Sequence, residues 1–244
     1  MYYYYWIFLG LILLCGIFAG NASRKVKTTF AALEQMPTRS RMTGYDTAKR
    51  LLKSEDVEDI SIGRVGGFLS DHYHPTKKTV NLSESVYGND SVAAVAVAAH
   101  EIGHVMQKKK GYLPYKLRSA LVGITNFGSR LALPLVLVGL ILDLFVVTTQ
   151  NSDLGYYLAL AGIALYGLSA LFAFVTLPVE YDASRRAKKM LIAEGVLTEE
   201  ELPYADKMLD AAATTYVASL LTSLVYFLRF AVWVLMLFGG RRRK

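Results

Sequence analysis

The feature that most constrains the fold of this chain is a set of long apolar runs. Residues 2–20 carry no charged side chain, and two further runs, 131–149 and 154–177, are separated only by residues 150–153. A helix of about 20 apolar residues is long enough to cross the hydrocarbon core of a bilayer. The first run therefore predicts an N-terminal anchor, and the closely spaced pair predicts a transmembrane hairpin.

A fourth apolar run, 216–238, is interrupted by Arg229 and followed by a basic tail. It either crosses the membrane or lies partly in the interface, with its arginine reaching the headgroups. Residues 2–20 could instead be a cleaved signal peptide, but such peptides begin with basic residues, and the first one here is Arg24. Asp143, in the second run, either faces protein or water or lies at the membrane end.

Composition supports a membrane protein and excludes other classes. Hydrophobic residues make up 53% of the chain and charged residues 19%, whereas soluble domains carry about 25% charged residues. The single cysteine, Cys15, excludes a disulfide framework and a cysteine-rich zinc module. The net charge of +7 comes from basic residues that flank the apolar runs. This arrangement favours membrane orientation over nucleic-acid binding, so we expect the lipid bilayer as a partner and no nucleic acid.

The basic residues also predict an orientation. Lysines and arginines follow the first and third runs but are absent from the short loop between the second and the third. Because cytoplasmic loops are enriched in such residues, 21–130 and 178–215 are expected in the cytoplasm, and the N-terminus and the hairpin loop outside. The sequence thus predicts a multi-pass cell-membrane protein.

The segment between the first two spans reads as a small water-facing domain. Residues 44–53 show the apolar spacing of a short amphipathic helix. Residues 57–87 are rich in β-branched residues and glycines, which predicts two or three short strands with a hairpin around 74–78. Strand 79–83 either forms a sheet edge that binds extended substrate or merely closes a small sheet. Residues 90–109 are predicted to form a helix.

This last helix carries the one motif with clear chemistry, His100-Glu101-Ile102-Gly103-His104. Histidines at i and i+4 project from one helical face, so both can bind one tetrahedral zinc ion. Glu101 follows the first histidine and is placed to take a proton from metal-bound water. The pattern is the HExxH motif of zinc peptidases.

A third ligand must come from elsewhere, because the longer motif with a third histidine would need glycine at 107 and histidine at 110. The chain has Gln107 and Lys110 at these positions. Residues 178–194 predict a helix that Pro178 begins, with Glu180 in its first turn, on the same side of the membrane as the histidines. Asp182 is the rival ligand, but it could equally pair with the arginines that follow it.

Four pieces of the chain carry a family resemblance: MTGYDTAKRLL (42–52), SDHYHPTKKTVNLSESVY (70–87), VAAHEIGHVMQ (97–107) and LPVEYDASRRA (177–187). In them the chain resembles the bacterial neutral zinc metallopeptidases of the YugP type, over nearly all of 1–215, and more distantly the HtpX-like and CAAX-prenyl membrane proteases. The resemblance implies one Zn²⁺ ion per chain, held by His100, His104 and Glu180, with Glu101 as general base. The distant relatives usually carry aspartate four residues after the ligand glutamate, where this chain has Ser184.

The sequence therefore predicts an α+β membrane protein, mostly helical, with three to four transmembrane helices and a small zincin-like domain with a short β-sheet. Its expected activity is zinc-dependent endopeptidase cleavage of membrane proteins or their cytoplasmic segments. The alternative is a non-catalytic, zinc-dependent scaffold or assembly factor. His72 and Tyr181 are further candidates for contacts with the oxyanion or substrate. The expected organisation is an anchor (1–23), the zincin-like domain (24–130), the hairpin (131–177), a helical segment with the third ligand (178–215), and a membrane helix with a basic tail (216–244).

Overall fold

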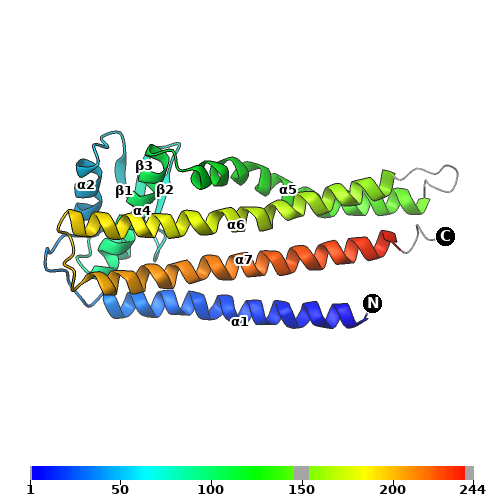
Figure 1. Cartoon of the computed structure of the whole chain (residues 1–244), viewed down its shortest axis with the longest axis horizontal. Coiled ribbons are helices and arrows are strands. Elements are labelled where there is room, and N and C mark those ends of the chain that lie inside the picture. The colour runs from blue at the N-terminus through cyan, green and yellow to red at the C-terminus, as the bar shows by residue number, and fades with distance from the viewer. Residues whose placement is uncertain (1, 146–153, 240–244) are drawn as a thin grey trace. The chain divides into compact units, whose positions relative to one another are not determined.

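The computed structural model describes the backbone of residues 2–145 and 154–239, and this part of the chain is mostly helical (Figure 1). Four helices are long: α1 (Tyr2–Leu33), α5 (Leu113–Phe145), α6 (Leu154–Ala193) and α7 (Leu202–Gly239). The shorter elements are α2 (Gly44–Ser54), β1 (Ser61–Val65), β2 (His72–His74), β3 (Thr79–Ser83), α3 (Glu84–Tyr87) and α4 (Val92–Lys109). The fold class is the expected one.

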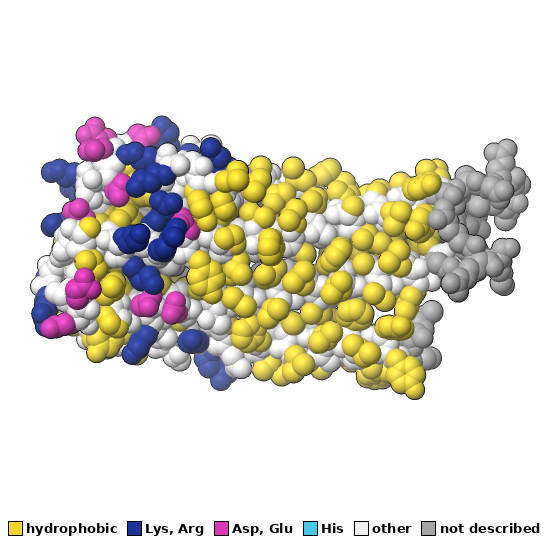
Figure 2. Space-filling view, in the orientation of Figure 1, with side chains coloured by type: hydrophobic (Ala, Val, Ile, Leu, Met, Phe, Trp, Pro, Cys, Tyr) yellow, Lys and Arg dark blue, Asp and Glu magenta, His cyan; other side chains and the backbone are white. Residues whose placement is uncertain are grey.

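The chain divides into two compact units. Unit 1 comprises Met1–Ala19, Leu117–Thr176 and Val217–Lys244, and unit 2 comprises Gly20–Lys116 and Leu177–Tyr216. Each of the four long helices is long and apolar enough to cross a membrane. This includes α7, which contains the fourth apolar run with Arg229 in it. Figure 2 shows hydrophobic side chains over the visible face of the unit 1 helices, whereas charged side chains gather over unit 2.

Small residues let α5 and α6 pack closely within unit 1. A Cβ atom on Gly139 would lie 2.5 Å from the carbonyl oxygen of Gly155, and one on Gly162 would lie 2.7 Å from that of Ala132. Close approach at small residues is the usual way in which helices associate in membranes, where the lipid is as apolar as the side chains. The two helices therefore lie against each other, and the transmembrane hairpin over 131–177 stays a prediction. Its loop, 148–153, and the side chain of Asp143 lie outside the described residues.

Unit 2 contains a three-stranded sheet in the order β1-β3-β2. β1 runs parallel to β3, and β2 pairs with β3 antiparallel, which confirms the hairpin expected around 74–78. The suggestion that strand 79–83 forms a substrate-binding edge is wrong. β3 is the central strand, and its backbone is paired on both sides, because Val80 and Leu82 are buried and anchor it in the middle of the sheet.

The expected helix start at Pro178 is also wrong, because α6 passes through this residue without a break. Proline removes one backbone hydrogen bond and usually ends or kinks a helix. Here Val179, Ala183 and Ala187 directly after it are buried. The helix is therefore held by packing on the far side of the proline, and this packing outweighs the local preference.

Candidate metal centre

The centre is built where α4 and α6 approach each other within unit 2. The first half of α4 is rich in buried alanines, and Ser91 caps its start by accepting a hydrogen bond from the backbone N–H of Ala94, at 3.2 Å. Inside the motif, a Cβ atom on Gly103 would lie only 2.5 Å from the carbonyl oxygen of Ala183 on α6. Glycine is therefore required at this position if the two helices are to lie so close.

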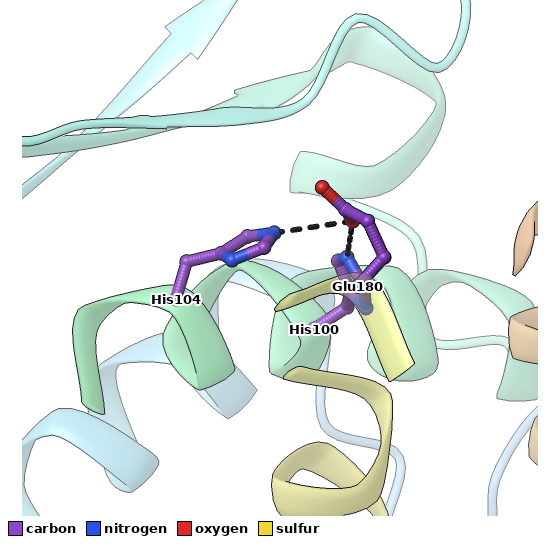
Figure 3. A group of neighbouring side chains, drawn as sticks. All are labelled: His100, His104 and Glu180. Carbon is purple, nitrogen blue, oxygen red and sulfur yellow. Dashed lines mark hydrogen bonds and ion pairs between the residues drawn. The ribbon is translucent and has the colours of Figure 1, made fainter. Parts of the chain in front are cut away.

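This approach brings three side chains that are far apart in the sequence to one point (Figure 3). The Oε2 atom of Glu180 lies 3.2 Å from Nε2 of His100 and 3.4 Å from Nε2 of His104. One potential ligand atom from each residue lies within 4.8 Å of the other two. All three side chains are nearly inaccessible, with exposed fractions of 13%, 10% and 2% for the two histidines and the glutamate.

This donor set fits a zinc ion. Zinc binds histidine nitrogen and carboxylate oxygen at about 2.0–2.2 Å, so two ligand atoms of a tetrahedral site lie about 3.4 Å apart. The two measured N···O separations match this edge length. Two imidazoles and one carboxylate also leave one position of the tetrahedron for water, as catalytic zinc sites require.

Both histidine rings are oriented by hydrogen bonds at their other nitrogen. Nδ1 of His100 lies 3.1 Å from the Ser184 hydroxyl, and Nδ1 of His104 lies 3.0 Å from Oε1 of Gln107. Since Oε1 of the glutamine only accepts, the His104 ring donates its Nδ1 proton to it, and in the neutral ring this leaves the lone pair on Nε2, the nitrogen that faces Glu180. Such partners fix the tautomer and direction of a metal-binding histidine.

Gln107 is the residue that the sequence analysis missed as a contributor to the site. It is fully buried, and its amide N–H groups donate to the carbonyl oxygen of Val179 at 2.7 Å and to Oδ2 of Asp182 at 3.0 Å. Asp182 in turn pairs with Arg185 and Arg186. Asp182, the rival ligand, therefore pairs with the arginines that follow it and lies outside the group of three.

The electrostatics of the centre are dominated by carboxylates. Burial alone would lower the pKa of His104, but the hydrogen bond and charge of Glu180, together with the charge of Glu101, raise it above its ordinary value. Glu101 is buried on α4. Burial also raises the pKa of Asp71, with a further contribution from Glu101, although Ser83 donates two hydrogen bonds to it. The charge of Glu101 thus contributes to the raised pKa of both His104 and Asp71.

The two remaining candidates lie outside the group of three. His72 is exposed in β2, where Nδ1 lies 2.9 Å from the carbonyl oxygen of Ser70 and Nε2 lies 3.1 Å from the side-chain nitrogen of Asn81. Both ring nitrogens are thus engaged, so His72 would have to break a hydrogen bond to contact an oxyanion. Tyr181 follows Glu180 on α6 and is about half exposed, at 49%.

Comparisons with known proteins identify the family of the chain. A family model described as "Putative neutral zinc metallopeptidase" matches residues 5–235. The "Putative membrane protease YugP" of Bacillus subtilis (strain 168) is 38% identical over 220 residues, which covers 90% of this chain and 92% of the relative. No solved structure matches the chain significantly. The extent of both matches shows that the chain belongs to this family of neutral zinc metallopeptidases.

Proposed function

We propose that the protein is a membrane-anchored zinc endopeptidase, in which His100, His104 and Glu180 hold one zinc ion and Glu101 is the general base. The observation that carries the proposal is the convergence of the three side chains, with both histidine–glutamate N···O separations close to the edge length of a zinc tetrahedron and all ligand atoms within 4.8 Å of one another. Family membership supports peptide hydrolysis as the reaction.

Each residue then has a definite task. Zinc, when bound, polarises the scissile carbonyl group and lowers the pKa of a water molecule toward 7. Glu101, one residue after His100 and buried, accepts the proton of this water and delivers it to the leaving amine. A purely structural zinc site needs no such base, so an intact Glu101 favours the enzyme over a scaffold.

The substrates that fit this site best are membrane proteins or their cytoplasmic segments. Each of the four long helices passes from unit 2 into unit 1 without a break. Glu180 lies four residues after Thr176, the last residue of α6 that belongs to unit 1. A peptide bond close to the end of a substrate's own membrane span would therefore reach the site most easily. The basic residues after the first and third spans support a cytoplasmic location.

The decisive variant is Glu101→Gln in the full-length protein. Glutamine has nearly the same shape but cannot accept a proton, and loss of a general base costs about 10²–10⁴ in rate. We expect the purified variant to keep one zinc ion by elemental analysis. New protein N-termini produced in cells expressing the wild type should be missing in cells expressing the variant.

The exposed Glu84, which lies 3.9 Å from Arg64 on the surface, provides the matched control. Glu84→Gln should retain both zinc and cleavage. If Glu101→Gln cleaves the same proteins at the wild-type rate, Glu101 is not the base. If it loses cleavage because zinc is lost, the role assigned to Glu101 is wrong as well.

A further inference from the structure

Unit 1 contains a cavity of its own, with a volume of about 770 Å³, between α1, α6 and α7. Its walls are mostly aromatic. Tyr166 of α6 packs on Phe230 of α7 with ring centroids 4.8 Å apart, and Phe230 packs on Trp233 at 6.2 Å. The volume is within the usual range for a site that holds a small molecule.

The part of α1 that lines this cavity is its beginning, Tyr4 to Phe8. Tyrosine and tryptophan are enriched where a membrane protein passes the lipid headgroups. Trp6 is 63% exposed and Trp233, on the opposite wall, is 42% exposed. The cavity is therefore open to its surroundings, and its aromatic lining is of the kind found at the depth of the lipid headgroups.

One charged side chain lines the cavity, Arg229 of α7. It is exposed, and none of the side chains that the structure describes in unit 1 is acidic. A guanidinium group within an apolar segment needs an anion or water, and its planar fork suits a phosphate group particularly well. The hydroxyl groups of Tyr166 and Tyr226 in the same lining can donate further hydrogen bonds.

We propose that this cavity binds an anionic phospholipid, with its phosphate on Arg229 and the beginning of its acyl chains against the aromatic wall. A phospholipid with a net negative charge is favoured because it neutralises the arginine. In a zwitterionic lipid the headgroup's own cation competes for the phosphate. All residues of this site belong to unit 1, so the proposal goes beyond the peptidase activity and does not depend on it.

The chain supplies its own probe, since it has two tryptophans, Trp6 and Trp233, and both line the cavity. Full-length protein in detergent is titrated with phosphatidylglycerol brominated on its acyl chains, or with phosphatidylcholine brominated in the same way. Bromine quenches tryptophan fluorescence at short range. We expect saturable quenching by phosphatidylglycerol at concentrations about fivefold lower than by phosphatidylcholine, the effect typical of one basic side chain on an anionic lipid.

Arg229→Gln should abolish this difference, whereas Arg229→Lys should retain most of it, because the ammonium group keeps the charge. Arg130 of α5, which does not line the cavity, is the control, and Arg130→Gln should behave like the wild type. Equal quenching by the two lipids in the wild type, as expected of a cavity that accepts a protein segment instead, would overturn the proposal. An unchanged preference for phosphatidylglycerol in Arg229→Gln would overturn it too.

Discussion

The contact between Gly103 and Ala183 allows a quantitative test of how the centre is assembled. Adding a methyl group with Gly103→Ala places a Cβ atom 2.5 Å from the Ala183 carbonyl oxygen, whereas ordinary van der Waals contact begins at 3.4 Å. The helices must therefore separate by up to 0.9 Å (3.4 − 2.5). Metal–ligand distances tolerate only about 0.2 Å. Since Glu180 is on the same helix as Ala183, it would be drawn away from both histidines.

Two opposing effects set the expected loss of stability. Alanine favours a helix over glycine by about 1 kcal/mol, whereas overpacking a filled interior costs about 1–3 kcal/mol. We expect Gly103→Ala to lower the free energy of unfolding of the metal-free protein by about 1 kcal/mol in net terms. Zinc affinity should fall by about 10–100-fold, the range seen when the support of metal ligands is disturbed.

The assay is competition between the purified protein and a chelator for zinc, combined with thermal unfolding of the metal-free form. Gly123 of α5 is the matched control, because it is also within a helix but has no heavy atom within 4 Å of its added Cβ position. Gly123→Ala should leave zinc affinity unchanged. Wild-type zinc affinity in Gly103→Ala would show that the close helix contact does not position Glu180.

Three further outcomes are expected. Glu180→Ala should lose stoichiometric zinc in elemental analysis, whereas Asp182→Ala should keep zinc and unfold at a lower temperature; the reverse result would make Asp182 the ligand. Single cysteines at 150–153, in a background lacking the native cysteine, should react with impermeant thiol reagents outside intact cells, and those at 76–78 only after permeabilisation. Because the pKa of His104 in the metal-free protein lies above its ordinary 6.5, protons should compete with zinc as the pH falls through that raised pKa, and the zinc dissociation constant should rise. In the metal-free protein the His104–Glu180 pair stabilises the fold below pH 6.5, and this contribution should be lost at higher pH, so the midpoint of thermal unfolding should fall as the pH rises.

Local signals predicted much of this structure because they act over a few residues. Apolar runs of sufficient length indicated the long helices. The spacing of His100 and His104 brings the two side chains to one face only if the segment is helical. The helix expected over 44–53 is present as α2, because Thr43 and Asp46 form a reciprocal capping box at its start. Such local features have the same sequence pattern in any tertiary surrounding.

The errors arose where packing between distant segments decides the outcome. The proline at 178 is a strong local signal for a helix boundary, yet buried side chains beyond it hold α6 in one piece. Strand 79–83 alternates apolar and polar residues as an edge strand does, but its neighbours were not visible in the sequence. β1 pairs with it in parallel, and parallel pairing depends on a connection rather than on a tight turn.

Gln107 shows which contacts follow from spacing along one helix and which depend on packing between two helices. Residues three apart share a helical face, so its closeness to His104 follows from the sequence alone. That its amide N–H groups reach Val179 and Asp182 depends on how near α6 lies, which the contact at Gly103 determines. A polar residue three positions after the second histidine can therefore be recognised as part of the site only when the position of α6 is also known.

The chemical character of these supporting groups matters for the proposed reaction. Ser184 and Gln107 are neutral, and the charge of Asp182 reaches His104 only through the amide and is offset by two arginines. A carboxylate in direct contact would make a ligand histidine more basic. With neutral partners the histidines donate less electron density, and Glu180 is the one carboxylate hydrogen-bonded to a histidine of the centre among the residues that the structure describes. Ser184 therefore orients His100 without adding charge, and it leaves the proposed metal more able to acidify the water whose proton Glu101 would accept.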